Sequence, residues 1–402
     1  MMPSEHPVRE AYRASIKHSL GPSQIEQWED GLLLVDDCGF VTACGAYDQL
    51  APRLPKEIPV RDYRGSFLVP GFVDCHVHLP QLDCRNKNGL TLLDWLQTYI
   101  YPAEAQFADP KWAEAVARRF FDTLLSHGIT TAAVYSTVHE EATNMAFKVA
   151  QEKGLRVIMG QVLMDQNAPQ ALLRPATQLL HETERLIQQW HGRQDRLFYA
   201  ITPRFALTCS ATLMKEAGKM ATQAGCYFQT HLAETQEEVR QAQTLHHFKN
   251  YAGFYESHHC LEKHSLLAHA IYLRDEEWTV LSDHHCAVAH CPTSNVFLKS
   301  GTMPLSTVER FGIRCGLGTD VGAGPTFSMR EVADCACEVQ PKGLVTPEKA
   351  FYLSTLGGAE ALSLAHQTGN FTEGKWADFA VFDNPHGRGC AKSVYIKGAC
   401  LL

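Results

Sequence analysis

The sequence predicts an α/β protein, in which a (β/α)8 TIM-like barrel stands beside a small β-sandwich domain formed by the N- and C-terminal segments. Eight short apolar segments recur from residue 66 onward, and helix-like stretches lie between them. Apolar runs broken by turns or glycines occupy both ends of the chain, which is typical of β structure. A length of 402 residues with 45% hydrophobic content suffices for a barrel and one smaller domain.

The eight apolar segments are the candidate strands of the barrel. They lie within residues 66–78, 128–137, 156–164, 197–207, 226–234, 266–273, 286–292 and 314–320. Helix-like stretches between them include 109–128, 211–225 and 234–248. Eight β/α units over roughly 250 residues are what a closed barrel requires. A doubly wound open sheet is the alternative, but it normally has a glycine-rich first turn, and the chain contains neither GxGxxG nor GxxxxGK[ST].

The two ends of the chain are expected to pair into one small β domain. Residues 31–45 carry short apolar runs broken by turns, and residues 369–384 alternate between apolar and polar positions with glycine punctuation. We therefore expect residues 1–69 and 369–402 to form the small domain. Residues 70–368 would form the barrel.

Composition narrows the partners that the protein can have. The formal net charge is −8 and no basic run is present, which argues against a nucleic-acid surface. No stretch reaches the length of a membrane span, and the first 20 residues lack the apolar core of a signal peptide. We therefore expect a cytoplasmic protein that acts on a small molecule. The 14 cysteines include no CxxC pair, which favours reduced thiols over disulfides or a cysteine-bound metal.

Polar residues that could carry chemistry gather at the predicted C-terminal ends of the strands. They are His76, His78, Arg204, His231, His269, His290 and Asp320. The C-terminal face of a β/α barrel is where active sites form. This regularity predicts an active site, because histidines that only fill a core have no reason to collect at that face.

Four of these residues are candidate metal ligands. The His76–His78 pair alone is weak evidence, since 20 histidines in 402 residues would produce an HxH about once by chance. Positions i and i+2 of a strand face the same way, so both rings could reach one ion, although two histidines on a wet strand face are the plain alternative. His231 ends the fifth strand, and Asp320 ends the eighth, unless it is merely a helix N-cap. Three neutral nitrogens and one carboxylate suit a catalytic zinc ion, which lowers the pKa of water to about 7.

Two further residues complete a hydrolytic reaction. Glu234, three residues after His231, is placed to hand a proton to a substrate nitrogen; its alternative role is a carboxylate that favours a helix N-terminus. Asp320 could also accept the proton of the attacking water. His269 would orient that water or stabilise negative charge, with a core histidine as the alternative.

The fourth predicted strand indicates how many metal ions to expect. Two-metal barrels of this kind commonly use a bridging lysine there. Residues 201–207 read ITPRFAL, with Arg204 and Phe205 and no lysine. This favours one zinc ion per subunit.

Several motifs taken together resemble the amidohydrolase superfamily, from about Gly65 to Asp383. They are PGFVDCHVHLPQ, TPRFALTCS, HLAET, LLAHAIYL, AHCPTSN, GLGTDVGAG, TLGGAEALSL and GNFTEGKWADFAVFD. The Pro–Gln pair after His78, the PRF of strand four and the segment YPAEAQF are similar more narrowly to the guanine deaminase family.

The resemblance implies hydrolytic deamination of guanine to xanthine and ammonia by a zinc-dependent homodimer. It implies zinc ligands at His76, His78, His231 and Asp320, catalytic roles for Glu234, Asp320 and His269, and substrate contacts from Gln81, Arg204, Phe205 and Glu234. An amide and a guanidinium fork can bind the carbonyl and ring-nitrogen edge of guanine, and Phe205 could cover the ring. Without the resemblance, Gln81 is an ordinary loop residue and Phe205 an ordinary core residue.

Other functions stay open on the sequence alone. One is hydrolysis of another aminated purine or of a triazine-like ring; another is a non-catalytic scaffold, which would be expected to lack some of the ligands. Trp95 and Tyr101 could wall the pocket, but core packing is favoured for both. Cys75 should point away from the histidine pair, and the histidine-rich run over residues 257–264 matches no metal-ligand pattern.

Overall fold

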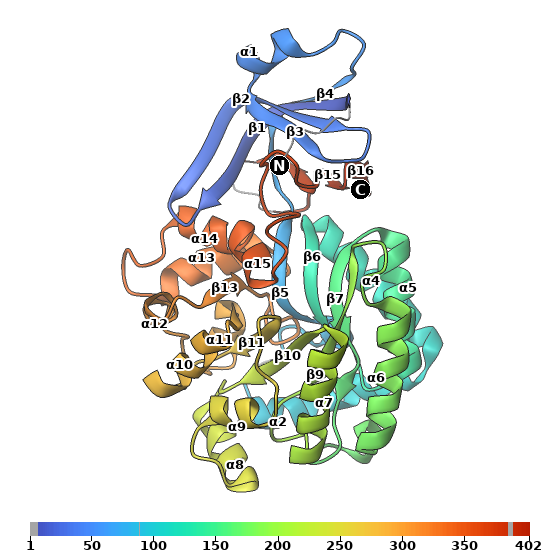
Figure 1. Cartoon of the computed structure of the whole chain (residues 1–402), viewed down its shortest axis with the longest axis vertical. Coiled ribbons are helices and arrows are strands. Elements are labelled where there is room, and N and C mark those ends of the chain that lie inside the picture. The colour runs from blue at the N-terminus through green and yellow to red at the C-terminus, as the bar shows by residue number, and fades with distance from the viewer. Residues whose placement is uncertain (1–6, 88, 385–388) are drawn as a thin grey trace.

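A computed structural model describes residues 7–87, 89–384 and 389–402 and shows a barrel with a β domain at one end (Figure 1). The barrel confirms the predicted (β/α)8 class, and strands from both ends of the chain meet in the β domain, as predicted. No helix among the described residues is long and apolar enough to cross a membrane. No disulfide joins any of the 14 cysteines, all of which lie among the described residues.

Eight parallel strands follow one another around the barrel in chain order. They are β5 (Phe72–His78), β6 (Ile129–Tyr135), β7 (Arg156–Gly160), β9 (Leu197–Pro203), β10 (Tyr227–Leu232), β11 (Ser265–His269), β12 (Ala287–His290) and β13 (Arg314–Leu317). A two-residue strand, β8 (Val162–Leu163), pairs with β9. Each of the eight predicted segments overlaps one of these strands, and only the sixth, which starts one residue after β11 begins, does not contain its strand whole. The apolar pattern therefore located the barrel correctly.

The last strand returns to the first, and this contact brings Asp320 back to the histidine pair. The Asp320 amide donates to the carbonyl of His76 at 2.8 Å, and the His78 amide donates to the carbonyl of Val321 at 2.9 Å. Gly318 is required at this seam, because a Cβ there would lie 2.8 Å from the Cβ of His76 and 3.0 Å from Sγ of Cys291. The glycine of GLGTD thus permits the close approach of β13 to β5.

Helices surround the strands (Figure 1). They are α4 (Pro110–Ser126), α5 (Glu140–Lys153), α6 (Ala176–Trp190), α7 (Ala211–Ala224), α8 (Gln236–His246), α9 (Tyr251–Ser257), α10 (Asp275–Asp283), α11 (Pro292–Phe297), α12 (Leu305–Arg310), α13 (Met329–Val339), α14 (Pro347–Leu353) and α15 (Leu356–Ala361). The ends of α7 show how the local sequence sets the limits of a helix. The Ser210 hydroxyl accepts from the Leu213 amide at 3.1 Å and caps the start, and Gly225, with φ of 63°, ends the helix. The three helical stretches predicted from sequence correspond to α4, α7 and α8.

A long connection follows β5 and reaches the C-terminal end of the barrel. It contains the 3-10 turn η2 (Leu79–Cys84), α2 (Leu92–Trp95), the π-helical turn η3 (Leu96–Ile100), α3 (Tyr101–Ala105) and the 3-10 turn η4 (Gln106–Ala108). The indole of Trp95 donates to the carbonyl of Lys87 at 2.7 Å, which fastens α2 to the start of the connection. This connection supplies one wall of the site described below.

The β domain is a seven-stranded sheet in the order β16-β15-β14-β4-β1-β2-β3. Its strands are β1 (Val8–Gly21), β2 (Gln24–Asp36), β3 (Val41–Ala46), β4 (Val60–Pro70), β14 (Phe379–Phe382), β15 (Ser393–Ile396) and β16 (Ala399–Cys400), and α1 (Tyr47–Leu50) and η1 (Ala51–Arg53) follow β3. The rings of Phe379 and Tyr395 stack at 4.3 Å in its core. The domain limits of 1–69, 70–368 and 369–402 stay a prediction.

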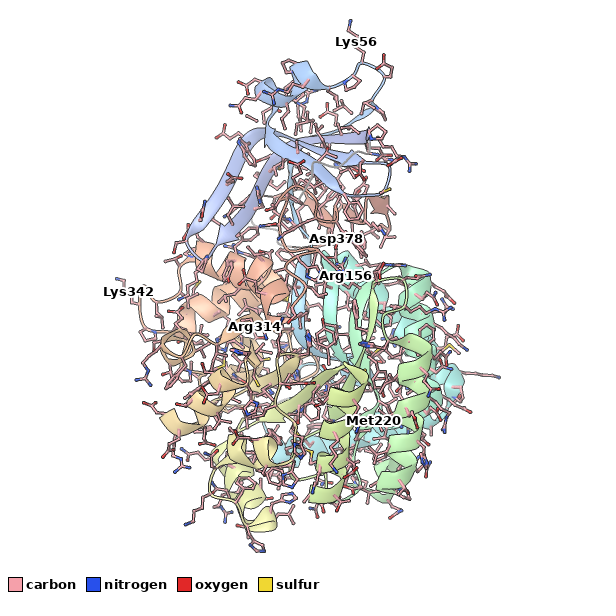
Figure 2. The ribbon with its side chains drawn as sticks, in the orientation of Figure 1. Lys56, Arg156, Met220, Arg314, Lys342 and Asp378 are labelled. Atoms are coloured by element: carbon pink, nitrogen blue, oxygen red, sulfur yellow. The ribbon has the colours of Figure 1, made fainter. Side chains whose placement is uncertain are left out.

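A buried ion pair joins the two parts of the chain. Arg156 begins β7, and Figure 2 shows it pointing toward Asp378 at the junction of barrel and β domain. The Arg156 guanidinium donates to Asp378, whose carboxylate also accepts from the Thr368 hydroxyl at 2.9 Å. Because both charges are fully buried, loss of either partner would leave an unpaired ion in the interior.

Candidate metal and substrate site

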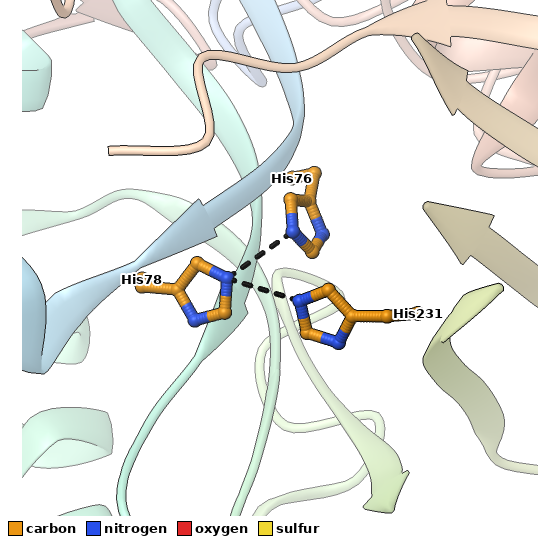
Figure 3. Close-up of side chains that lie close together, drawn as sticks. All are labelled: His76, His78 and His231. Carbon is orange, nitrogen blue, oxygen red and sulfur yellow. Dashed lines mark hydrogen bonds between the residues drawn. The ribbon is translucent and has the colours of Figure 1, made fainter. Parts of the chain in front are cut away.

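Three histidines and one aspartate converge at the C-terminal end of the barrel. His76 and His78 project from β5 on the same side, as the i, i+2 spacing predicted, and His231 faces them from β10 (Figure 3). Nε2 of His78 lies 3.2 Å from Nε2 of His76 and 3.3 Å from Nε2 of His231. Oδ1 of Asp320 lies 3.3 Å from Nε2 of both His76 and His78. The structure thus brings together all four predicted ligands.

These separations suit ligand atoms that share one metal ion. Zinc–nitrogen bonds of roughly 2.0–2.1 Å place neighbouring ligand atoms about 3.3 Å apart. Burial lowers the pKa of His76, lowers that of His78 to about 3 and lowers that of His231 well below its usual range. When these three rings are neutral, the lone pairs of their Nε2 atoms point to one place. A nitrogen that carries a lone pair there cannot donate a hydrogen bond to its neighbours. A cation at that point matches the chemistry of this donor set.

Other buried groups hold the ligands in place. The His231 Nδ1–H donates to the carbonyl of Arg204 at 2.7 Å, which leaves its Nε2 lone pair for a metal. Asp74 accepts from the Thr319 hydroxyl at 2.6 Å and from the His76 amide at 3.2 Å, and so links β5 to the loop after β13. Such supports fix both the tautomer and the direction of the ligand rings.

Cys75 and the histidine-rich run over residues 257–264 lie apart from this site. The Cys75 thiol points to the carbonyl of Gly358, at 3.7 Å, on the other side of β5. The His258 ring bonds to the carbonyl of Phe254 at 2.7 Å. Among the described residues, no group of potential metal ligands includes a residue of the run over 257–264. His290 is buried at the end of β12 but does not line the cavity described next.

Glu234 and His269 lie beside the four ligands. The Ser300 hydroxyl donates to Oε1 of Glu234 at 2.8 Å, and Nε2 of His269 lies 3.6 Å from Oε2 of Glu234. Burial raises the pKa of Glu234, which favours the protonated acid. Burial alone would lower the pKa of His269, but the carboxylates of Glu234 and Asp320 outweigh it and raise that pKa. The two shifts favour a protonated Glu234 and a cationic His269.

Asp320 has the opposite electrostatic character. Burial alone would raise its pKa, but the neighbouring side chains of His76 and His78 outweigh it and hold the pKa well below the usual range. The Ser294 hydroxyl donates to its second oxygen, Oδ2, at 2.5 Å. One oxygen, Oδ1, therefore faces the histidines, while Ser294 holds the other.

A cavity opens onto these groups. Its lining includes the predicted substrate contacts Gln81, Arg204 and Phe205, together with apolar side chains of Leu92, Trp95 and Leu298. Apolar walls with a few convergent polar groups suit a small flat ring. Trp95 lines the cavity, although core packing was favoured for it from the sequence. Tyr101 packs against Arg204, with its ring centre 5.4 Å from the guanidinium carbon.

Sequence reasoning missed several polar partners of the site. Glu104 accepts from Arg204 and Gln81, Ser300 donates to Glu234, and the amide oxygen of Asn295 lies 3.0 Å from Nδ1 of His269. Glu104 lies in YPAEAQF and Asn295 in AHCPTSN, so both were within motifs that the sequence singled out. Ser300 carries no comparable signal.

Comparison with known proteins agrees with this geometry. Residues 67–400 match the amidohydrolase family, so the chain belongs to that family and is a hydrolase of its metal-dependent type. Within the family, the chain is similar to guanine deaminases. The guanine deaminase of Escherichia coli (strain K12) is 39% identical over 359 residues, which cover 88% of this chain and 81% of that protein.

Solved structures give the same result. The structure of E. coli guanine deaminase matches with a TM-score of 0.92 and 33% identity, covering 97% of this chain and 99% of that one. Guanine deaminase from C. acetobutylicum, crystallised with guanine bound in the active site, matches with a TM-score of 0.91 and 26% identity, covering 98% and 100%. The likeness therefore extends over both the barrel and the β domain.

Proposed function

We propose that the chain catalyses the hydrolytic deamination of guanine, in which guanine and water give xanthine and ammonia. The observation that carries this proposal is the cavity itself. Arg204 and Gln81 line it together with Glu234 and Asp320. The ligand histidines His78 and His231 lie in the same lining. The similarity to guanine deaminases over most of the chain supports the same reaction.

One zinc ion would be held by His76, His78, His231 and Asp320. A zinc ion bound there supplies Lewis acidity, which lowers the pKa of water to about 7. A single metal position is supported by the geometry, because the two clusters of candidate ligands at this site share His76. The absence of a lysine from ITPRFAL supports it as well.

The substrate would be bound through its edge and its face. The Arg204 guanidinium and the Gln81 amide present N–H donors suited to the carbonyl oxygen of guanine. The Phe205 ring would cover the face of the base. This arrangement would leave the carbon that bears the amino group beside Glu234 and Asp320.

The two carboxyl groups would divide the proton transfers. Asp320 would accept a proton from the attacking water, and Glu234 would protonate the ring nitrogen next to the reacting carbon. His269 would stabilise the negative charge that develops during the attack. Glu234, now ionised, would take the second proton of the water from the new hydroxyl and relay it to the leaving amine. The proton held by Asp320 would then restore the acid form of Glu234. The oxygen of the consumed water ends as the new carbonyl, and its two protons end on ammonia and on the ring nitrogen.

The second candidate is deamination of another aminated purine or of a triazine-like ring. The N–H donors of Arg204 and Gln81 favour guanine, because adenine presents an amino group where guanine presents a carbonyl oxygen. A non-catalytic scaffold would not need all four ligands and both proton carriers in one cavity. A homodimer and a cytoplasmic location are further expectations for this enzyme.

A substrate panel tests the proposed function. Purified, zinc-loaded protein would be assayed by absorbance and ammonia release with guanine, adenine, 8-oxoguanine and several triazines. We expect kcat/KM for guanine to exceed that for every other compound. Ammonia release from adenine but not from guanine would disprove the substrate assignment and leave the metal site intact.

A further inference from the structure

Glu104 is a buried carboxylate that the proposed reaction does not use. It lies on α3, in the long connection after β5, and only 1% of its surface is exposed. We propose that Glu104 is a positioning residue that fixes the donors of Arg204 and Gln81 and thereby determines specificity for a carbonyl group on the purine. This inference rests on the proposed function and explains how the enzyme would select guanine.

The contact with Arg204 orients a buried cation. Nη1 of Arg204 donates to Oε1 and Oε2 of Glu104, each at 2.8 Å, and the Arg204 side chain is only 4% exposed. Arg204 also lines the cavity. Among the described residues, its Nε and Nη2 atoms have no hydrogen-bond acceptor. Glu104 therefore neutralises the guanidinium and occupies one of its nitrogens. The remaining N–H groups are left for a ligand.

The contact with Gln81 sets the direction of its amide. Nε2 of Gln81 donates to Oε1 of Glu104 at 3.2 Å, and Oε1 of Gln81 accepts from the Gly322 amide at 3.3 Å. A carboxylate only accepts, and a backbone amide only donates, so the two partners together allow one orientation of the amide. The second N–H of Gln81 is then free to join the donors of Arg204.

A single oxygen couples the two residues. Oε1 of Glu104 accepts from both Arg204 and Gln81, so neither can move without affecting the other. The result is a rigid set of N–H donors. These donors can bind a carbonyl oxygen of the substrate, and they would repel an amino group at the same ring position. Without the carboxylate, the Gln81 amide could invert and the guanidinium could rotate. Recognition of the carbonyl oxygen would then weaken, while the groups around His231 would be unaffected.

The test compares two purines that lack the amino group at C2 and so cannot be deaminated there. Hypoxanthine carries the C6 carbonyl of guanine, and purine carries no group at C6. Calorimetry on zinc-loaded protein would measure the dissociation constants of both for wild type, Glu104→Gln, Glu104→Asp and the control Glu182→Gln. Glu182 is also a buried glutamate that accepts from a glutamine, since Nε2 of Gln161 lies 2.6 Å from its Oε2, but it lies on α6 and does not line the cavity.

We expect Glu104→Gln to weaken hypoxanthine binding about tenfold or more, because a donor set for a buried acceptor is lost. Purine binding should change by less than about threefold. Glu104→Asp, which keeps the charge on a shorter side chain, should lie between wild type and Glu104→Gln. The control variant should bind like wild type, and zinc content should stay the same in all four proteins.

Equal weakening of hypoxanthine and purine would overturn the proposal, as would unchanged hypoxanthine binding. If Glu104→Gln does not fold, the same comparison in Glu104→Asp decides. Guanine turnover by the wild type distinguishes failure of the proposed function from failure of the role of Glu104. A wild type without turnover contradicts the proposed function, whereas normal turnover with an unchanged hypoxanthine-to-purine ratio in the variant contradicts only the role of Glu104.

Discussion

Replacement of Glu234 by glutamine removes the proposed acid and little else. Glutamine has nearly the same volume, and its amide oxygen can still accept the hydrogen bond from the Ser300 hydroxyl, which is 2.8 Å long in the wild type. Burial raises the pKa of Glu234, which favours a protonated carboxyl, and glutamine cannot supply that proton. General acid catalysis contributes about 10²- to 10⁴-fold, or about 3 to 5 kcal/mol of activation free energy. We therefore expect kcat for guanine to fall about a thousandfold.

The assay is the loss of guanine absorbance at saturating substrate, with zinc content measured on the same samples. Glu234 does not donate one of the converging ligand atoms, so zinc content should match the wild type. Glu237→Gln is the matched control, because Glu237 lies three residues further on but is exposed and paired with Arg240. Its activity should be normal. A Glu234→Gln protein that keeps its zinc and retains more than a tenth of wild-type kcat would refute the role of Glu234.

Three further substitutions test other parts of the site. His231→Ala removes one of three converging nitrogens, so zinc content after dialysis should fall well below that of the wild type; full retention would exclude His231 as a ligand. Arg204→Lys replaces a planar fork by a single ammonium, and KM for guanine should rise about tenfold with a smaller change in kcat; an unchanged KM would contradict a substrate contact. Glu238, on α8, lines the cavity, and burial raises its pKa from 4.5 to about 7. The folded state therefore binds the extra proton, and stability falls as pH rises through that window. Glu238→Gln lacks this loss and should gain about 3 kcal/mol relative to wild type between pH 4.5 and 7.5 in denaturant titrations, whereas a difference independent of pH would contradict the assignment.

The barrel and its metal cluster could be predicted because both follow from local patterns. Each strand is a short apolar segment, and the polar residue that ends it must lie at the C-terminal face. The alternation of a strand places His76 and His78 on one side, and closure of the barrel brings Asp320 to them. The carbonyl of His76 accepts from the Asp320 amide at 2.8 Å, which is the contact that closure requires.

The polar partners of the site could not be predicted, because they depend on how irregular segments pack. Glu104 and Arg204 are separated by 100 positions in the sequence, and their contact depends on the path of the connection after β5. A glutamate in a short helix normally faces solvent, so nothing local indicates that Glu104 is buried. Ser300 reaches Glu234 from a loop with no periodic pattern.

The limits of the two domains have no clear signal in the sequence either. β4 ends at Pro70 and β5 begins at Phe72, so almost no linker separates the β domain from the barrel.

Titration of metal-free protein with zinc, with guanine turnover followed at each step, tests the central claim most directly. The claim is that His76, His78, His231 and Asp320 hold one zinc ion that the deamination of guanine requires. We predict no turnover without metal, a linear rise in xanthine formation with added zinc, and a plateau at one zinc per chain. Full turnover by the metal-free protein, or a plateau at two zinc ions per chain, would contradict it.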